Sequence, residues 1–256
     1  KVAAALLDAE ARAARLQVRP GLSGLWQVSR EGKRDITASI LNGHLSAPRI
    51  LDVGCGTGGL LNRLQENGWA VGVDLSDVAL QFAQQRGLRN LADASIEALP
   101  FKSASFDMLT CMDVLYHLQV QEDVAALREC YRVLRPGGWF LVKVPAFEAL
   151  RGEHDRTVHT RHRYTVEELR GKCEAAGFRV ERATYANTFL LPVAAAKRIL
   201  EPLIPLAPTG SSDVAMGPPW LNSILTQVLR TEARLVRHVD LPVGLTAVAL
   251  AQRPPV

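Results

Sequence analysis

The segment Ile50-Leu-Asp-Val-Gly-Cys-Gly-Thr-Gly58 restricts the fold of this chain more than any other part of the sequence. An apolar strand over 49–53 runs into a glycine-rich turn that opens a helix over 58–67. The glycines allow positive φ and a close approach of a ligand to the backbone. Free N–H groups at the start of the helix favour a carboxylate or a phosphate. This pattern predicts an α/β sheet with a ligand at the carboxyl end of its first strand.

Strands and helices alternate along the rest of the chain. Short apolar strands separated by helices predict a parallel sheet with right-handed crossovers. We expect a doubly wound, Rossmann-like sheet of seven strands, with a helical insertion at about 190–236 before the last strand. The expected strands are 49–53, 70–74, 89–92, 106–111, 139–144, 178–186 and 245–251, and the main helices are 58–67, 77–86 with Ser76 as N-cap, 121–134, 166–176, 190–204 and 219–236.

The glycine turn alone leaves the ligand open. Gly54, Gly56 and Gly59 fit the dinucleotide fingerprint, and Asp74 follows Asp52 at a distance suited to binding ribose hydroxyls. A nicotinamide-dependent oxidoreductase and an adenosyl-ligand enzyme therefore both remain possible at this point. A third reading is that the acidic residues only cap helices and the glycines only make turns.

Four further blocks resemble class I S-adenosylmethionine (SAM)-dependent methyltransferases. They are the acid Asp52 before the glycines, then 92–101, 105–108 and 134–139, in the order and at the spacing of that family. The resemblance implies SAM as cofactor and a last strand that runs antiparallel between two parallel ones. It implies that Asp52 and the glycine turn hold the methionine part, Asp74 the ribose and Asp93 the adenine. The full set of expected cofactor-binding residues is Asp52, Gly54, Cys55, Gly56, Gly58, Asp74, Leu75, Asp93, Ala94 and Ser95.

Two segments are expected to line the acceptor site, because each follows a strand at its carboxyl end. Residues 112–117 come after the strand at 106–111, and 153–164 come after the strand at 139–144. His117 is the preferred general base, since its reference pKa lies near neutrality; the alternative is that it only shapes the SAM site. A dedicated base is dispensable where alignment supplies most of the rate. The expected catalytic residues are His117, Asp113 and Tyr164, and the expected substrate-binding residues are Tyr116, His154, Asp155 and Arg163.

Two resemblances bear on the acceptor. Residues 153–164 are similar to a stretch in a subset of class I methyltransferases associated with polysaccharide assembly, which implies a glycan-related acceptor. Residues 18–29 resemble the C-terminal signature of bacterial sugar transferases, whose catalytic portion this sequence lacks. The alternative at 18–34 is a basic-aromatic lead-in helix over the cofactor. We therefore expect a lead-in at 1–45 and a methyltransferase domain at 46–253.

Composition limits the remaining classes. Hydrophobic residues make up 48% of the 256 residues, enough for a sizeable core, and a net charge of +4 is too weak to predict nucleic-acid binding. The four cysteines show no zinc-ligand spacing, so no metal is expected and a reduced, cytoplasmic location is favoured. We expect a small-molecule or glycan-related acceptor and no specific protein partner; a lipid-linked acceptor would add peripheral membrane contact. A non-catalytic SAM-binding module in a glycan-assembly complex is the alternative from another class.

Overall fold

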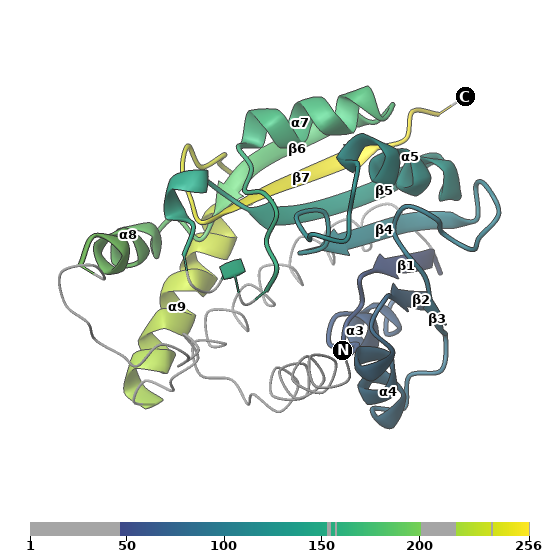
Figure 1. The fold of residues 1–256 in the computed structure, drawn as a ribbon, viewed down its shortest axis with the longest axis horizontal. Coiled ribbons are helices and arrows are strands. Elements are labelled where there is room, and N and C mark those ends of the chain that lie inside the picture. The colour runs from purple at the N-terminus through teal and green to yellow at the C-terminus, as the bar shows by residue number, and fades with distance from the viewer. Residues whose placement is uncertain (1–46, 153–154, 157, 201–218, 237, 256) are drawn as a thin grey trace, which may run out of the picture.

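The fold is a single sheet of seven strands with helices on both faces (Figure 1). The computed structural model describes residues 47–152, 155–156, 158–200, 219–236 and 238–255. The strand order is β3-β2-β1-β4-β5-β7-β6. The strands are β1 Arg49–Val53, β2 Trp69–Asp74, β3 Leu91–Asp93, β4 Phe106–Met112, β5 Leu134–Pro145, β6 Arg179–Ala186 and β7 Thr246–Gln252.

The last strand lies inside the sheet rather than at its edge. β7 pairs antiparallel with β5 on one side and with β6 on the other, whereas β1 to β5 pair parallel among themselves. β6 therefore runs in the same direction as β1 to β5, and all six end at one edge of the sheet. The predicted seven-stranded sheet with an antiparallel last strand is confirmed.

The helices divide between the two faces of the sheet. Buried side chains of α5 and α7 pack on one face, and those of α3 and α4 pack on the other. Ser76 caps α4 as predicted, because its Oγ accepts a hydrogen bond from the Ala79 N–H at 3.3 Å. The helices are α3 Leu61–Leu64, α4 Asp77–Gln85, α5 Asp123–Val133, the 3₁₀ helix η1 Glu148–Leu150, α7 Val166–Ala175, α8 Leu191–Leu200 and α9 Pro219–Val236.

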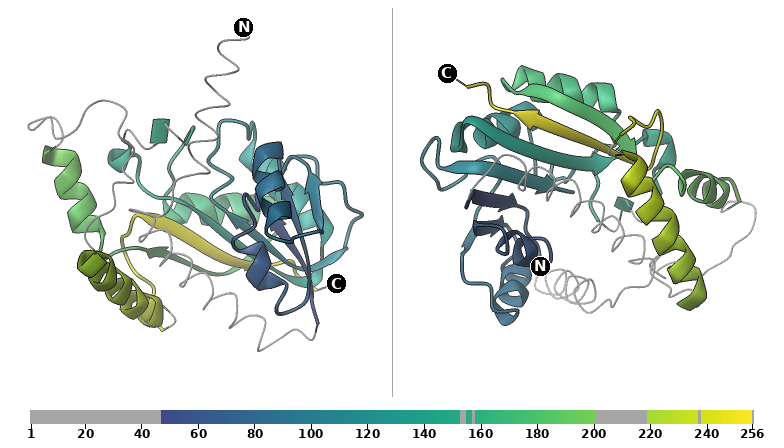
Figure 2. Two further views of the ribbon diagram at one scale, coloured as in Figure 1. Left: turned by 90° about the horizontal axis from the view of Figure 1, so that it is seen from below. Right: turned by 180° about the vertical axis from the view of Figure 1, so that it is seen from behind.

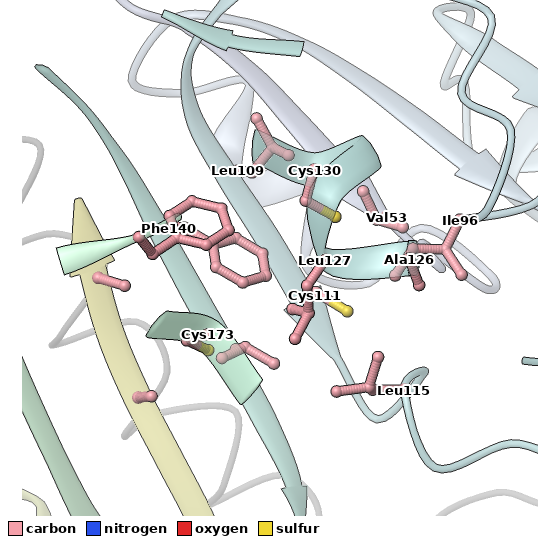
Figure 3. Packing of buried hydrophobic residues seen from close by; sticks show 14 of the residues in the cluster. Val53, Ile96, Leu109, Cys111, Leu115, Ala126, Leu127, Cys130, Phe140 and Cys173 are labelled. Atoms are coloured by element: carbon pink, nitrogen blue, oxygen red, sulfur yellow. The ribbon is translucent and has the colours of Figure 1, made fainter. Parts of the chain in front are cut away.

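The larger part of the core lies between the sheet and α5 and α7 (Figure 3). Phe140 of β5 and Leu127 of α5 are fully buried there, beside the thiols of Cys111 and Cys173. Burial raises the pKa values of both thiols, so they stay protonated and act as small apolar side chains. This packing fixes β4 and β5, the two strands whose ends border the expected acceptor site.

The helical insertion lies beside β6 and β7, at the opposite end of the sheet from α3 and α4 (Figures 1 and 2). The buried carboxylate of Glu232 on α9 accepts hydrogen bonds from the backbone N–H groups of Asn187 and of Phe189, the latter at 2.9 Å. These bonds tie α9 to the segment that leads into α8. Among the described residues, no helix combines the length and the apolar character needed to cross a membrane. The predicted lead-in over 1–45, the last residues of the predicted helix 190–204 and the predicted loop between it and 219–236 lie outside those residues.

Candidate active site

The glycine turn after β1 is built by backbone hydrogen bonds and by close packing. The N–H groups of Gly54 and Cys55 both donate to the Val73 carbonyl of β2, at 2.8 and 2.9 Å. Gly54, Gly56 and Gly58 all have positive φ, at 70°, 54° and 77°. This conformation favours glycine. The positive φ angles confirm the predicted glycine turn, and its bonds to Val73 fold it back over the end of β2.

The three glycines differ in what surrounds them. A Cβ at Gly54 would lie 2.0 Å from Val114 Cγ2, and a Cβ at Gly58 would lie 2.1 Å from Leu88 Cδ1. Around Gly56, by contrast, no atom of the described residues other than its chain neighbours lies within 4 Å of such a Cβ. Gly54 and Gly58 are thus needed for internal packing, while Gly56 borders space that the described part of the chain leaves open and that a ligand could fill.

Asp74 joins this turn to the end of β2. Its carboxylate accepts hydrogen bonds from the Gly56 N–H at 2.8 Å and from the Ser76 N–H at 2.9 Å. Carboxylate oxygens each accept more than one hydrogen bond, so capacity remains for ribose hydroxyl groups. Leu75, the next residue, is 46% exposed, and Asp93 lies opposite Asp74 in the parallel register of β2 and β3. The exposed Leu75 side chain therefore lies next to two carboxylates at the carboxyl edge of the sheet, where it could cover a planar ring.

Two other predicted cofactor residues lie below the turn. Asp52 is 2% exposed, and its Oδ1 accepts a hydrogen bond from Thr110 Oγ1 of β4 at 2.7 Å. The Cys55 side chain is buried in the core against α3, where burial and the nearby carboxylates of Asp52 and Asp74 raise its pKa. Cys55 can therefore meet a ligand only through its backbone.

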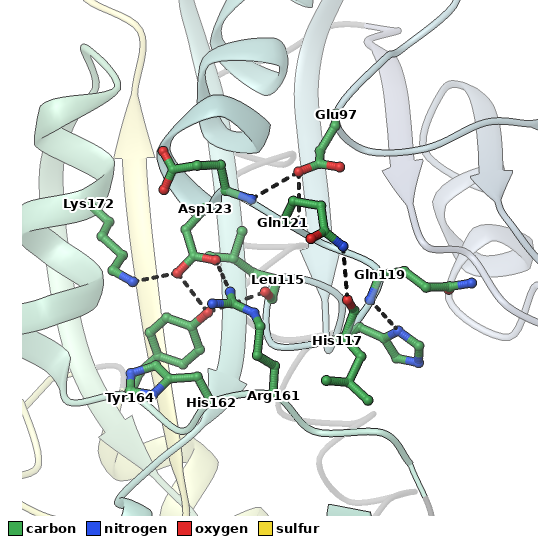
Figure 4. A network of polar contacts seen from close by, with 12 residues as sticks. Glu97, Leu115, His117, Gln119, Gln121, Asp123, Arg161, His162, Tyr164 and Lys172 are labelled. Atoms are coloured by element: carbon green, nitrogen blue, oxygen red, sulfur yellow. Dashed lines mark hydrogen bonds and ion pairs between the residues drawn. The ribbon is translucent and has the colours of Figure 1, made fainter.

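The segment after β3 is fixed to α5. Ala94 and Ser95 are half-buried, and the Ala94 N–H donates to the Asp74 carbonyl at 3.3 Å. Glu97 Oε1 accepts hydrogen bonds from the N–H groups of Gln121 and Glu122, at 2.9 and 3.0 Å (Figure 4). Glu97 thus caps the start of α5 and holds the expected adenine side of the site beside the segment that follows β4.

The structure brings the two expected acceptor segments together. His117 and Thr160 form an isolated antiparallel bridge, and the Arg161 N–H donates to the Tyr116 carbonyl at 2.8 Å. The rings of His117 and His159 stack with their centroids 5.9 Å apart. His117 Nδ1 also accepts a hydrogen bond from the Gln119 N–H at 3.3 Å. His159 was not singled out in the sequence; its place in the His/Arg-rich segment was the available signal.

Tyr164 lies in the core rather than at the surface of the site. It is fully buried, and its hydroxyl group lies 3.0 Å from Asp123 Oδ2 and 3.2 Å from the Leu115 carbonyl oxygen (Figure 4). Burial, followed by the charge of Asp123, raises the pKa of Tyr164. A phenol held in this way stays protonated and anchors the loop, which disagrees with the catalytic role expected for Tyr164.

Asp123 is the centre of a buried charged network that the sequence analysis missed. It is 3% exposed at the first turn of α5, and it forms ion pairs with Arg161 and with Lys172 of α7 (Figure 4). Together with Tyr164, these contacts join α5, the segment 158–164 and α7. A single aspartate at the start of a helix is typical of a helix cap, so the local sequence does not predict that Asp123 pairs with Arg161 and Lys172.

Arg163 and Asp155 also bind each other. Arg163 Nε lies 2.8 Å from Asp155 Oδ1, the two side chains are 13% and 2% exposed, and Arg163 Nη1 donates to the Ala146 carbonyl at 2.7 Å. Burial raises the pKa of Asp155, but hydrogen bonds from Arg163 and the Gly152 N–H outweigh it and the net pKa is lowered. The pair braces the loop, which leaves little of either side chain for a substrate. His154, expected to bind substrate, lies outside the described residues.

Asp113 adjoins the end of β5. Its Oδ2 lies 2.6 Å from Lys143 Nζ, and its backbone has a positive φ of 64°. Tyr116 and His117 are half-buried on the same segment. Of the residues expected in the acceptor site, Asp113, Tyr116 and His117 thus lie at the carboxyl edge with partial exposure, beside the glycine turn.

Comparison with known proteins agrees with this geometry. Residues 51–142 match the family model described as Methyltransferase domain. These residues contain most of β1, all of β2 to β4 and α5, and β5 as far as Val142, and therefore the glycine turn, Asp74, Asp93 and the segment 112–117. The match supports a methyltransferase domain within 51–142, and S-adenosylmethionine is the cofactor of its class; the predicted domain bounds of 46–253 stay a prediction.

The curated relatives cover part of the chain. A ubiquinone biosynthesis O-methyltransferase from Paracidovorax citrulli is 39% identical over 103 residues, which are 37% of this chain and 42% of that protein. One from Nitrosospira multiformis is 38% identical over 102 residues, again 42% of that protein. The chain thus matches less than half the length of these relatives, and the match does not extend to their complete sequences.

Solved structures agree in fold. A SAM-dependent methyltransferase of Thermotoga maritima, titled as a possible histamine N-methyltransferase, has a TM-score of 0.53 at 20% identity, covering 89% of this chain and 92% of that one. The [4+2]-cyclase SpnF has a TM-score of 0.56 at 23% identity, covering 87% and 80%. Because a cyclase shares the fold, the likeness identifies the architecture and leaves the reaction to be argued from the site.

Proposed function

We propose that this chain binds S-adenosylmethionine across the carboxyl edge of β1, β2 and β3 and transfers its methyl group to an oxygen atom of a small-molecule acceptor. The observation that carries the proposal is the turn at Gly56. This residue has positive φ, borders space that no other part of the described chain fills apart from its neighbours, and donates its N–H to the Asp74 carboxylate. The names of the curated relatives, which are O-methyltransferases, support oxygen as the methylated atom.

The residues of the chain fit this cofactor. The glycine turn would receive the methionine part near its free backbone N–H groups, Asp74 would accept hydrogen bonds from the ribose hydroxyls, and the exposed Leu75 would cover the adenine. The cofactor supplies a methyl group already activated by its sulfonium. The protein must therefore align the acceptor and exclude water, which lowers a barrier without a strong base.

The acceptor would lie between the segments after β4 and β5. His117 borders this region, and its Nδ1 accepts a hydrogen bond from Gln119. We place the His117 ring beside the acceptor, where an imidazole can orient a hydroxyl oxygen. We assign His117, Tyr116 and Asp113 to orienting the acceptor, and Arg163, Asp155 and Tyr164 to bracing the loop behind them.

A glycan-related acceptor is the finer form of this proposal. Its support is the similarity of residues 153–164 to the polysaccharide-associated subset and the density of His and Arg in that segment. The buried Arg163–Asp155 pair removes two of the contacts that a sugar was expected to use. A small hydroxylated acceptor therefore has the better support, and a lipid-linked or free sugar is the competitor to test.

An acceptor screen tests the proposal. Purified protein is incubated with methyl-labelled S-adenosylmethionine and three groups of acceptors: catechols and other phenols, free sugars, and lipid-linked sugars. We expect a labelled product with a phenolic or other small hydroxylated acceptor, and calorimetric binding of S-adenosylhomocysteine without binding of NAD. Product formed only from sugars would select the glycan form. Binding of NAD in place of S-adenosylhomocysteine would overturn the assignment, and binding without any product would favour a non-catalytic module.

The role of Tyr164 gives a separate prediction. Tyr164→Phe removes the hydroxyl that bonds to Asp123 and leaves the ring in the core. We expect the free energy of unfolding to fall by about 1–2 kcal/mol, while turnover per bound cofactor stays within about threefold, since a proton-transfer residue contributes roughly 100-fold or more. Chemical denaturation and initial rates measure the two quantities. If turnover fell by roughly 100-fold or more while the free energy of unfolding stayed the same, Tyr164 would be a catalytic residue after all.

A further inference from the structure

A buried lysine, Lys143, lies near the end of β5. Lys143 is 8% exposed and lies between the buried residues Val142 and Val144. Lysine is almost never this buried unless it is paired. Its Nζ lies 2.6 Å from Asp113 Oδ2, with side chains 10% and 15% exposed. The lysine thus meets a carboxylate at the ends of two neighbouring strands, next to the expected acceptor region.

Lys143 holds Asp113 at two points. The Asp113 N–H donates to the Lys143 carbonyl at 3.0 Å, and the two side chains form the ion pair. Between these contacts the backbone of Asp113 takes a φ of 64°, a conformation that costs energy in residues other than glycine. Such a conformation persists where the surroundings impose it, and the pair with Lys143 is part of those surroundings.

This anchor reaches the glycine turn through the next residue. Val114 follows Asp113, and its Cγ2 occupies the place that a Cβ on Gly54 would take, 2.0 Å away. The position of Asp113 therefore sets how the segment 113–117 lies against the turn that is expected to hold the cofactor. Lys143 is thus linked to the glycine turn through Asp113 and Val114.

We propose that Lys143 is a positioning residue that fixes Asp113 and the segment 113–117 for the acceptor; this rests on the proposed methyl transfer. Held by the Lys143 ammonium group, the Asp113 carboxylate would accept a hydrogen bond from the acceptor hydroxyl and orient its oxygen. When that oxygen takes the methyl group, S-adenosylhomocysteine leaves and the hydroxyl proton passes to solvent. The acceptor class that suits this pair is a neutral compound with a hydroxyl group, since the ion pair adds no net charge to the site.

Four variants test the proposal: Lys143→Met, Lys143→Arg, Asp113→Asn, and the double variant Asp113→Asn with Lys143→Met. Asn tolerates the left-handed backbone, so Asp113→Asn removes charge without new strain. Lys102→Met, at an exposed site in the loop before β4, is the control. For each protein we measure amide hydrogen exchange of residues 113–118 with S-adenosylhomocysteine bound, the unfolding midpoint, and kcat and KM for the acceptor returned by the screen.

We expect Lys143→Met to speed exchange at 113–118 by about tenfold or more relative to β1, and to raise the acceptor KM more than it lowers kcat. Lys143→Arg should restore both readouts to within about threefold, because the charge is kept. The double variant should regain the unfolding midpoint, since no unpaired charge is left, but not the slow exchange or the acceptor KM.

Two results would overturn the inference. One is unchanged exchange and KM in Lys143→Met; the other is a double variant in which order and KM return together with stability, which would make the pair a core contact only. Exchange decides the matter even without an acceptor. Failure of the wild-type protein to bind S-adenosylhomocysteine would contradict the proposed function instead. That measurement needs no variant, so the two proposals can fail separately.

Discussion

Gly56→Val is expected to abolish cofactor binding in a protein that still folds. Apart from its chain neighbours, no described residue lies within 4 Å of the new Cβ, so the valine side chain displaces a ligand and no part of the described core. Calorimetric affinity for S-adenosylhomocysteine should fall by about 100-fold or more, equivalent to roughly 2.7 kcal/mol. Circular dichroism and an unfolding curve establish that the domain is intact.

Gly87→Val is the matched control for this substitution. Gly87 also has positive φ, at 87°, and apart from its chain neighbours no described residue lies within 4 Å of a Cβ there, but it joins α4 to β3 at the opposite edge of the sheet. Both variants carry the same kind of backbone strain, about 1–3 kcal/mol. Equal affinity losses in the two would mean that strain alone explains the effect and that the cofactor does not lie over Gly56.

Asp123→Ala is expected to cause the largest loss of stability among single substitutions at the site. It leaves Arg161 and Lys172 without the carboxylate that joins them, and the Tyr164 hydroxyl keeps only its contact with the Leu115 carbonyl. Breaking a buried pair costs about 3–5 kcal/mol. Because the two cationic side chains are 32% and 27% exposed, water screens part of this cost and we expect the lower end. A loss of about 3 kcal/mol corresponds to a fall of roughly 6–12 °C in Tm.

Asp240→Ala serves as the comparison at an exposed ion pair. Asp240 bonds to Arg182 at 2.6 Å, but its side chain is 61% exposed, so its removal should cost less than about 1 kcal/mol. Differential scanning calorimetry of both variants measures the contrast. If Asp123→Ala costs no more than Asp240→Ala, the network around Asp123 is not a structural brace.

The parts of the fold that follow from short-range pattern were predictable. β1 has the predicted bounds of 49–53, and Ser76 caps α4 as expected, because an apolar strand, a glycine turn and a cap are each encoded within a few residues. The antiparallel position of β7 came from the family resemblance; no local pattern contains the partner of a strand. The helix after the turn is shorter than the predicted 58–67, since two consecutive glycines open it and α3 begins only at Leu61.

The parts of the site that depend on contacts across the sheet could not be predicted in the same way. Arg163 and Asp155 were expected to face a substrate, yet they bind each other inside the loop. Lys143 lies in an apolar strand, and the sequence of that strand does not predict its pairing with Asp113, which follows the neighbouring strand β4. A charged residue that becomes buried needs a partner, but the sequence does not show whether that partner is a ligand or another side chain; the fold does.

The place of β7 between β5 and β6 has a consequence for the order in which the chain folds during synthesis. β6 borders the sheet only through β7, so residues 179–186 have no strand to pair with until residues 246–252 have left the ribosome. At synthesis rates of about 5–20 residues per second, that gap of some 60 residues leaves the edge of β5 and all of β6 unpaired for several seconds. Unpaired strand edges recruit other chains. A nascent chain stalled within the insertion would therefore be the form of this protein most prone to aggregate or to need a chaperone.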